Sequence, residues 1–169
     1  MAILPIYEFP HSILRQKAKK VKRIDKSIEQ LANDMVDTMH EANGVGLAAN
    51  QVGVLRRIIV LHLPEEENPR VYINPEIIHR EGERPVDERC LSMPGYSAVI
   101  NRSIWVKAKG IDLKSQTFRL RADGLFAQAL EHEIDHLNGI MYFDHLKNHE
   151  QLIKDEPSPH PQSAEVSIK

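Results

Sequence analysis

The pentapeptide His132-Glu133-Ile134-Asp135-His136, inside the proline-free stretch 122–139, constrains this chain more than any other feature. The stretch predicts a helix. Residues four apart share one helix face, so His132 and His136 can bind one metal ion through their imidazole nitrogens. Glu133 can then reach a water on that metal without binding the metal itself. The pattern is typical of metal-assisted hydrolysis. The alternative is a polar helix face whose histidines meet solvent or a buried carboxylate.

Two histidines supply only half of a tetrahedral site, and a catalytic site needs a third protein ligand and an open position. The candidates are Cys90, the remaining histidines and the acidic residues. Cys90 is the only cysteine, so it cannot form an intramolecular disulfide, and it lies in a stretch that contains a turn. A Cys-His-His set is chemically sound, because a metal favours thiolate and makes a bound water acidic. A lone cysteine is more often a small buried hydrophobe.

Hydrophobic periodicity predicts the remaining elements. Apolar residues recur at steps of three and four over 25–43, which indicates a helix with Asp25 as its N-cap. Short β-branched runs predict strands at 57–63, 71–75, 77–86, 98–112 and 117–121. We expect the strand at 71–75 to end at Pro75 and the next one to bend at Gly82. A turn at 110–115 would join the last two strands in a hairpin.

The motif helix predicts how these elements are arranged. It also has an apolar face, made of Phe126, Leu130, Ile134 and Leu137. A helix with one core face and one site face must be covered by other elements. We therefore expect an α+β fold, with antiparallel strands and sheets wrapped around a central helix that bears the motif. Residues 1–150 would form a single catalytic domain, and the proline- and serine-rich residues 151–169 a disordered tail.

Bulk composition argues against several classes of partner. The 169 residues carry a net charge of −2 with a pI near 6.5, so overall charge favours neither nucleic acid nor an anionic membrane. No apolar run approaches the length of a membrane span, and the start lacks the pattern of a signal peptide. We expect a cytoplasmic protein with no membrane partner and no direct nucleic-acid partner. The basic run 17–22 is interpreted as a solvated surface segment.

The run Gly44–Gly53 is rich in glycine and alanine, which lets backbone approach a ligand or the central helix closely. It lacks the lysine and the spacing of a phosphate-binding loop, so we reject that interpretation. Gln51 offers both a donor and an acceptor on a side chain long enough to reach a site. Its alternative is a surface amide.

Three blocks, Gly44–Gln51, Glu88–Ser92 and Gln128–His136, resemble the three signature motifs of the peptide deformylases, in that family's order. The resemblance covers roughly residues 3–147. It implies an enzyme that removes the N-formyl group from the N-terminal methionine of newly synthesised polypeptides and releases formate. The implied partners are these nascent chains, with a transient contact to the ribosome.

The resemblance also assigns roles to residues that match the motifs. The implied metal ligands are Cys90, His132 and His136. The metal would be Fe²⁺, with Zn²⁺ or Ni²⁺ as a substitute. Glu133 would be the general acid and base, while Gln51 and the backbone N–H of Leu91 would stabilise the developing oxyanion. The implied substrate-binding residues are Val45, Gly46, Val86, Leu125 and Ala129.

One position departs from the family pattern, because Arg89 stands where the family usually has glycine before the cysteine. Either Arg89 keeps ordinary backbone angles and faces solvent, or the loop is shifted. We expect Arg102 to help anchor this loop. Two rival functions stay open. One is a zinc endopeptidase, which would need a third histidine or a carboxylate such as His145 or Asp144, and the other is a metal-stapled binding module without turnover.

Overall fold

The computed structural model describes residues 2–156. Its central element is the motif helix α2, Gly124–Leu137. The larger of two antiparallel sheets has the strand order β1 (Gly46–Ala48), β2 (Ile58–Leu61), β3 (Arg70–Glu81), β6 (Trp105–Ile111) and β7 (Thr117–Asp123). The smaller sheet consists of β4 (Arg84–Glu88), β5 (Tyr96–Arg102) and β8 (Ile153–Lys154), with β5 in the middle.

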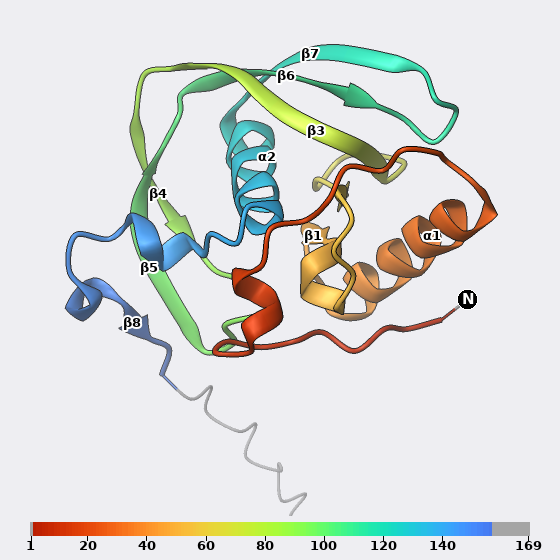
Figure 1. Cartoon of the computed structure of the whole chain (residues 1–169). Helices are drawn as coiled ribbons and strands as arrows, with labels where there is room; N and C mark the ends of the chain where they lie inside the picture. Colours follow the sequence, from red (N-terminus) through yellow and green to blue (C-terminus); the bar gives the residue numbers. More distant parts are fainter. Residues whose placement is uncertain (1, 157–169) are drawn as a thin grey trace, which may run out of the picture.

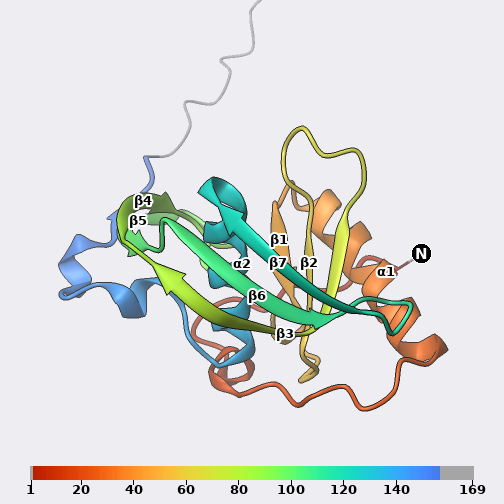
Figure 2. The same cartoon turned by 90° about the horizontal axis from the view of Figure 1, so that it is seen from above.

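Figure 1 shows α2 at the centre, with β3, β6 and β7 passing over it, β4 and β5 beside it, and α1 (Lys26–Glu41) beyond β1. Figure 2, seen from above, shows β3, β6 and β7 lying across the helix. The expected α+β fold with strands wrapped around a central helix is confirmed. Short 3-10 turns complete the described chain: Ser12–Arg15, Ala49–Val52, Tyr142–His145 and His149–Gln151.

The apolar face of α2 packs into a core formed mainly with the larger sheet. Leu130 and Leu137 are fully buried in a cluster with Ile59 of β2 and Val106 of β6. Burying one leucine contributes roughly 2 kcal/mol relative to leaving it exposed. This face therefore fixes the rotation of the helix, which leaves His132 and His136 on the side away from the core.

Helix α1 begins as the sequence predicts. The Asp25 carboxylate accepts a hydrogen bond from the Ile28 N–H, which confirms the N-cap. Met35 and Met39 are fully buried with Leu47 and Ile58, so the apolar stripe of the helix packs against β1 and β2. The methionines fill core space, and the helix braces the sheet edge that carries β1.

One predicted strand boundary is wrong. Strand β3 does not end at Pro75 but continues to Glu81. Its pairing with β6 shifts register between Ile73 and Glu76, and Asn74 there has φ +51°. A bulge leaves one residue out of the ladder, so a proline without an N–H can lie within it. The predicted bend at Gly82 is confirmed by its φ of +65°.

The single strand expected over 98–112 is two strands in different sheets, β5 and β6. The chain crosses between the sheets at Ser103, whose N–H donates to Oε1 of Glu131 at 2.8 Å and whose hydroxyl contacts Oε2 at 3.2 Å. Helix α2 thus fixes the crossing point, and apolar alternation along one segment cannot reveal such a contact. The hairpin between β6 and β7 is confirmed, with Ile111 opposite Thr117.

The sequence prediction starts the disordered tail too early, at residue 151. Strand β8 pairs with β5, with Tyr96 opposite Lys154, and the Asp155 N–H donates to the Gly95 carbonyl at 2.8 Å. The paired backbone of β5 supplies order that the polar sequence does not reveal. Residues 157–169 of that tail lie outside the described residues. Within the part of the chain that the structure describes, no helix has the length and apolar character to cross a membrane.

Candidate metal centre

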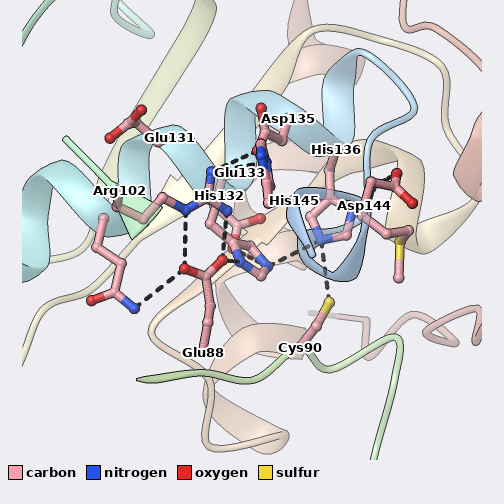
Figure 3. Close-up of polar contacts among 12 residues, drawn as sticks. Glu88, Cys90, Arg102, Glu131, His132, Glu133, Asp135, His136, Asp144 and His145 are labelled. Atoms are coloured by element: carbon pink, nitrogen blue, oxygen red, sulfur yellow. Dashed lines mark hydrogen bonds and ion pairs between the residues drawn. The ribbon is translucent and has the colours of Figure 1, made fainter. Parts of the chain in front are cut away.

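Helix α2 brings His132 and His136 together on one face, as their spacing predicts. Their Nε2 atoms lie 3.2 Å apart, and Nε2 of His136 lies 3.2 Å from Sγ of Cys90 (Figure 3). The three donor atoms all lie within 4.8 Å of one another and all three residues are buried. Cys90 follows the end of β4, so the strand pairing of the smaller sheet delivers the thiol to the helix.

The donor set fits a divalent metal ion. Donor atoms held tetrahedrally by one ion at about 2.1 Å lie about 3.4 Å apart, close to the observed separations. One thiolate with two imidazoles suits zinc or ferrous iron, and three protein ligands leave a position for water or substrate. Burial and the charge of nearby groups hold the pKa of His136 well below its ordinary value, so this imidazole is a neutral ligand.

A buried ion-pair network orients the candidate ligand His132. Nδ1 of His132 donates to Oε1 of Glu88, and the same carboxylate receives two hydrogen bonds from Arg102, at 2.6 and 3.0 Å. Arg102 also reaches Asp135 at 2.6 Å. Burial alone would raise the pKa of Glu88, but hydrogen bonds from His132 and Arg102 outweigh it and lower the value to about 2. The ionised carboxylate therefore fixes the ring so that Nε2 faces the metal site.

Sequence reasoning missed Glu88 and Asp135 as contributors to the site. A signal for Glu88 existed, since metal-binding histidines generally donate their second ring N–H to a carboxylate or carbonyl. Glu88 is the acidic residue of the second motif, two positions before Cys90. The expected anchoring role of Arg102 is confirmed, because its side chain is 2% exposed and bridges β5 to both β4 and α2.

Glu133 lies beside the candidate metal site with one oxygen free to act. Its Oε2 is buried and has no hydrogen-bond partner among the described residues. Burial raises the pKa of this carboxyl to about 7, and a bound cation nearby would draw it down again. The absence of a side chain at Gly46 leaves room for the Glu133 carboxylate. A Cβ on Gly46 would lie 2.7 Å from Oε1 of Glu133 and 2.8 Å from Leu61.

Gln51 is 1% exposed and held at both ends, so it is not a surface amide. Its Oε1 accepts from the Ala48 N–H at 2.9 Å, and its Nε2 donates to Oγ of Ser92 at 3.1 Å and lies 3.6 Å from Sγ of Cys90. The Leu91 N–H has no acceptor within residues 2–156. The side-chain amide of Gln51 is therefore a held donor beside Cys90.

A cavity of about 490 Å³ opens from the metal site to solvent. The expected substrate-binding residues that line it are Val45, Gly46, Leu125 and Ala129. Val86 does not line it and instead packs with Leu14 and Ile100 in a separate apolar cluster. Val86 belongs to the strand that carries Glu88, and its role in substrate binding stays a prediction. Alternation along β4 turns Val86 and Glu88 to the same sheet face, and packing decides which of them reaches the site.

The structure shows where Arg89 and His145, the two remaining residues of interest, direct their side chains. Arg89 extends into solvent, with its side chain 60% exposed, and forms an ion pair with Asp155. His145 does not join the ligand cluster but contacts Asp135 at 2.8 Å. An endopeptidase could use His145 as its third metal ligand, but this imidazole contacts Asp135 next to Arg102 (Figure 3).

Comparison with known proteins gives one consistent result. The family model "Polypeptide deformylase" matches residues 3–152. The chain is 51% identical over 152 residues to a peptide deformylase of Dehalococcoides mccartyi strain BAV1, covering 90% of this chain and 91% of that protein. It is 46% identical over 147 residues to one from Thermodesulfovibrio yellowstonii, with 85% and 89% covered. The crystal structure of a peptide deformylase from Legionella pneumophila superposes with a TM-score of 0.85 at 40% identity, covering 89% of each chain.

Proposed function

The chain belongs to the polypeptide deformylase family, whose members remove the N-formyl group from nascent polypeptides, and we propose that Cys90, His132 and His136 hold its metal. The observation that carries the proposal is the convergence of one buried sulfur and two imidazole nitrogens within 4.8 Å. A bound metal would polarise the formyl carbonyl and make a water acidic enough to react near neutral pH. The family resemblance favours Fe²⁺, with Zn²⁺ or Ni²⁺ as a substitute, and all three accept this mixed ligand set.

Within that site we assign the proton transfers to Glu133. Its partnerless Oε2 can accept the proton of the attacking water and deliver it to the nitrogen of the leaving peptide. As the formyl carbonyl oxygen gains charge, Nε2 of Gln51 and the N–H of Leu91 donate hydrogen bonds to it. One such donor is commonly worth about 3 kcal/mol in the transition state.

The cavity supplies the substrate-binding surface of this proposal. Apolar side chains of Val45, Leu125 and Ala129 suit a methionine side chain, and the bare backbone of Gly46 lets the peptide approach Glu133. A formyl group carries hydrogen where an acetyl group carries a methyl. A close-fitting site therefore rejects acetylated ends sterically.

We propose that the two sheets and α2 act as one catalytic domain, which extends past residue 150 because Asp155 also lines the cavity. We place the enzyme in the cytoplasm, with transient contact to the ribosome, where formylated chains emerge. Support comes from the class of substrate that the family acts on and from the bacterial relatives.

Anaerobic metal analysis paired with a formate assay tests this function. With formyl-Met-Ala-Ser as substrate, formate release should follow metal content. Loss of activity in air would identify iron, whereas indifference to air would indicate zinc or nickel. No formate from fully metal-loaded protein would overturn the proposal and favour a binding module. Cleavage of an unformylated peptide would instead point to an endopeptidase.

A further inference from the structure

The rim of the cavity carries a pair of charges that the deformylation chemistry does not use. Five charged residues, counting histidine, line the cavity: Glu88, Arg89, His132, Glu133 and Asp155. Glu88, His132 and Glu133 are at most 8% exposed and belong to the metal site. Among the described residues, only Arg89 and Asp155 therefore present charge at the solvent side of this cavity. Their side chains are 60% and 30% exposed.

The backbone holds both members of the pair in place. Arg89 directly follows β4, whose last residue pairs with Ala98 of β5. Asp155 directly follows β8, and its N–H donates to the Gly95 carbonyl at 2.8 Å. Both therefore extend from the edges of one three-stranded sheet. Their ion pair joins the chain beside the thiol ligand to the C-terminal segment.

We propose that Arg89 is a specificity-determining residue that favours acidic side chains in the two residues after formyl-methionine, with Asp155 as the residue that positions it. The proposal rests on the substrate pocket proposed above. A peptide whose formyl group lies at the metal and whose methionine is buried must leave the cavity past its rim. Its following side chains therefore pass the Arg89–Asp155 pair.

The preference for acidic over basic side chains follows from the contacts and the exposure of Arg89 and Asp155. Only one nitrogen of Arg89, Nη1, contacts Asp155, and a guanidinium has five N–H donors in a planar fork. It can therefore accept a second carboxylate. Asp155 contacts Arg89 through Oδ2 alone, but its side chain is only half as exposed as that of Arg89, so a passing substrate side chain meets the guanidinium more readily than the carboxylate. An acidic substrate residue consequently gains a more accessible partner than a basic residue does.

The test uses formyl-Met peptides that carry Glu, Gln or Lys at the second or the third residue, with formate as the readout. At one of these positions the wild-type enzyme should show kcat/KM for Glu over Lys of about two- to fivefold, the size that an exposed ion pair supplies. The effect should lie in KM, because the contact persists from bound substrate to transition state. It should also shrink at high salt.

Variants of Arg89 and Asp155 give the decisive comparisons. Arg89→Gln should abolish the preference and Arg89→Glu should reverse it, and Asp155→Asn should keep its direction. The exposed Lys20 does not line this cavity, so Lys20→Gln removes equal charge as a matched control and should keep the wild-type preference. A merely structural role for Arg89 would instead lower kcat for all three peptides alike.

Three results would overturn the proposal. Equal kcat/KM for Glu and Lys peptides at both positions, with the Gln peptide turned over normally, would contradict the proposed specificity. The proposed deformylase function would be unaffected. A preference that survives Arg89→Gln would contradict the specificity in the same way. No turnover of the Gln peptide by metal-loaded wild-type enzyme would overturn this proposal together with the proposed function.

Discussion

Nδ1 of His132 donates a hydrogen bond to Oε1 of Glu88, a residue 44 positions earlier in the chain. This bond decides which ring nitrogen faces Cys90. It is the contact by which the smaller sheet orients a proposed metal ligand on α2.

Replacing Glu88 should therefore weaken metal binding without removing a ligand. We expect Glu88→Gln to lower metal affinity by about 10- to 100-fold, the usual cost of losing such a partner. Competition with a chelator of known affinity measures the change. Asp87→Asn is the matched control, because Asp87 is exposed on the same strand and should leave affinity unchanged. Equal affinities in the two variants would contradict the orienting role of Glu88.

Cys90 and His145 distinguish the proposed ligand set from that of an endopeptidase. Cys90→Ser should reduce the metal content from about one ion per chain to nearly none, because serine is a poor replacement for thiolate. His145→Gln should keep its metal, since His145 contacts Asp135 and lies outside the cluster. Metal analysis after gel filtration gives both numbers. The opposite pattern would move the third ligand to His145.

Glu133 should matter for turnover and not for metal binding. We expect Glu133→Gln to keep a full complement of metal and to lose at least about a hundredfold in kcat, the size of a lost general base. The formate assay and metal analysis on the same sample check this. Unchanged turnover would remove Glu133 from the proposed proton transfers.

Gly46 tests the close approach between β1 and α2. Gly46→Ala places a methyl group 2.7 Å from Oε1 of Glu133, so the carboxylate must move and kcat should fall by about 10-fold or more. Gly124→Ala serves as a control, because Gly124 has φ +52° and open space around its Cβ position. It should cost about 1 kcal/mol of stability and spare kcat. Normal kcat in Gly46→Ala would show that the site tolerates the added atom.

The buried Glu88 carboxylate should make stability depend on pH in metal-free protein. Its pKa is about 2 in the fold against an ordinary 4.5, so it stabilises the fold above pH 4.5. That contribution, up to about 3 kcal/mol, is lost as pH falls from 4.5 toward 2. Urea unfolding between pH 5 and 3 should show a steeper decline for wild type than for Glu88→Gln. Parallel curves would mean that Glu88 has the same pKa folded and unfolded.

The sequence by itself determined the parts of this protein that depend on local spacing. The four-residue step between His132 and His136 requires one helix face, and the apolar stripe of α1 requires a core beside it. Cys90 and Gln51 were also identifiable as candidates, because their motifs are short and contiguous, whereas the burial of Gln51 came from the structure.

Only the tertiary structure decided which distant groups meet. Glu88 was adjacent in sequence to recognised residues, but its role exists only because β4 lies against α2. The passage of β3 through Pro75 depends on a bulge against β6, and Asp155 reaches the cavity only because β8 pairs with β5. Such contacts are set by sheet register and by the packing of one element on another. Side-chain periodicity within a single segment shows which face is buried, but it does not identify the segment that packs there or the position of a bulge.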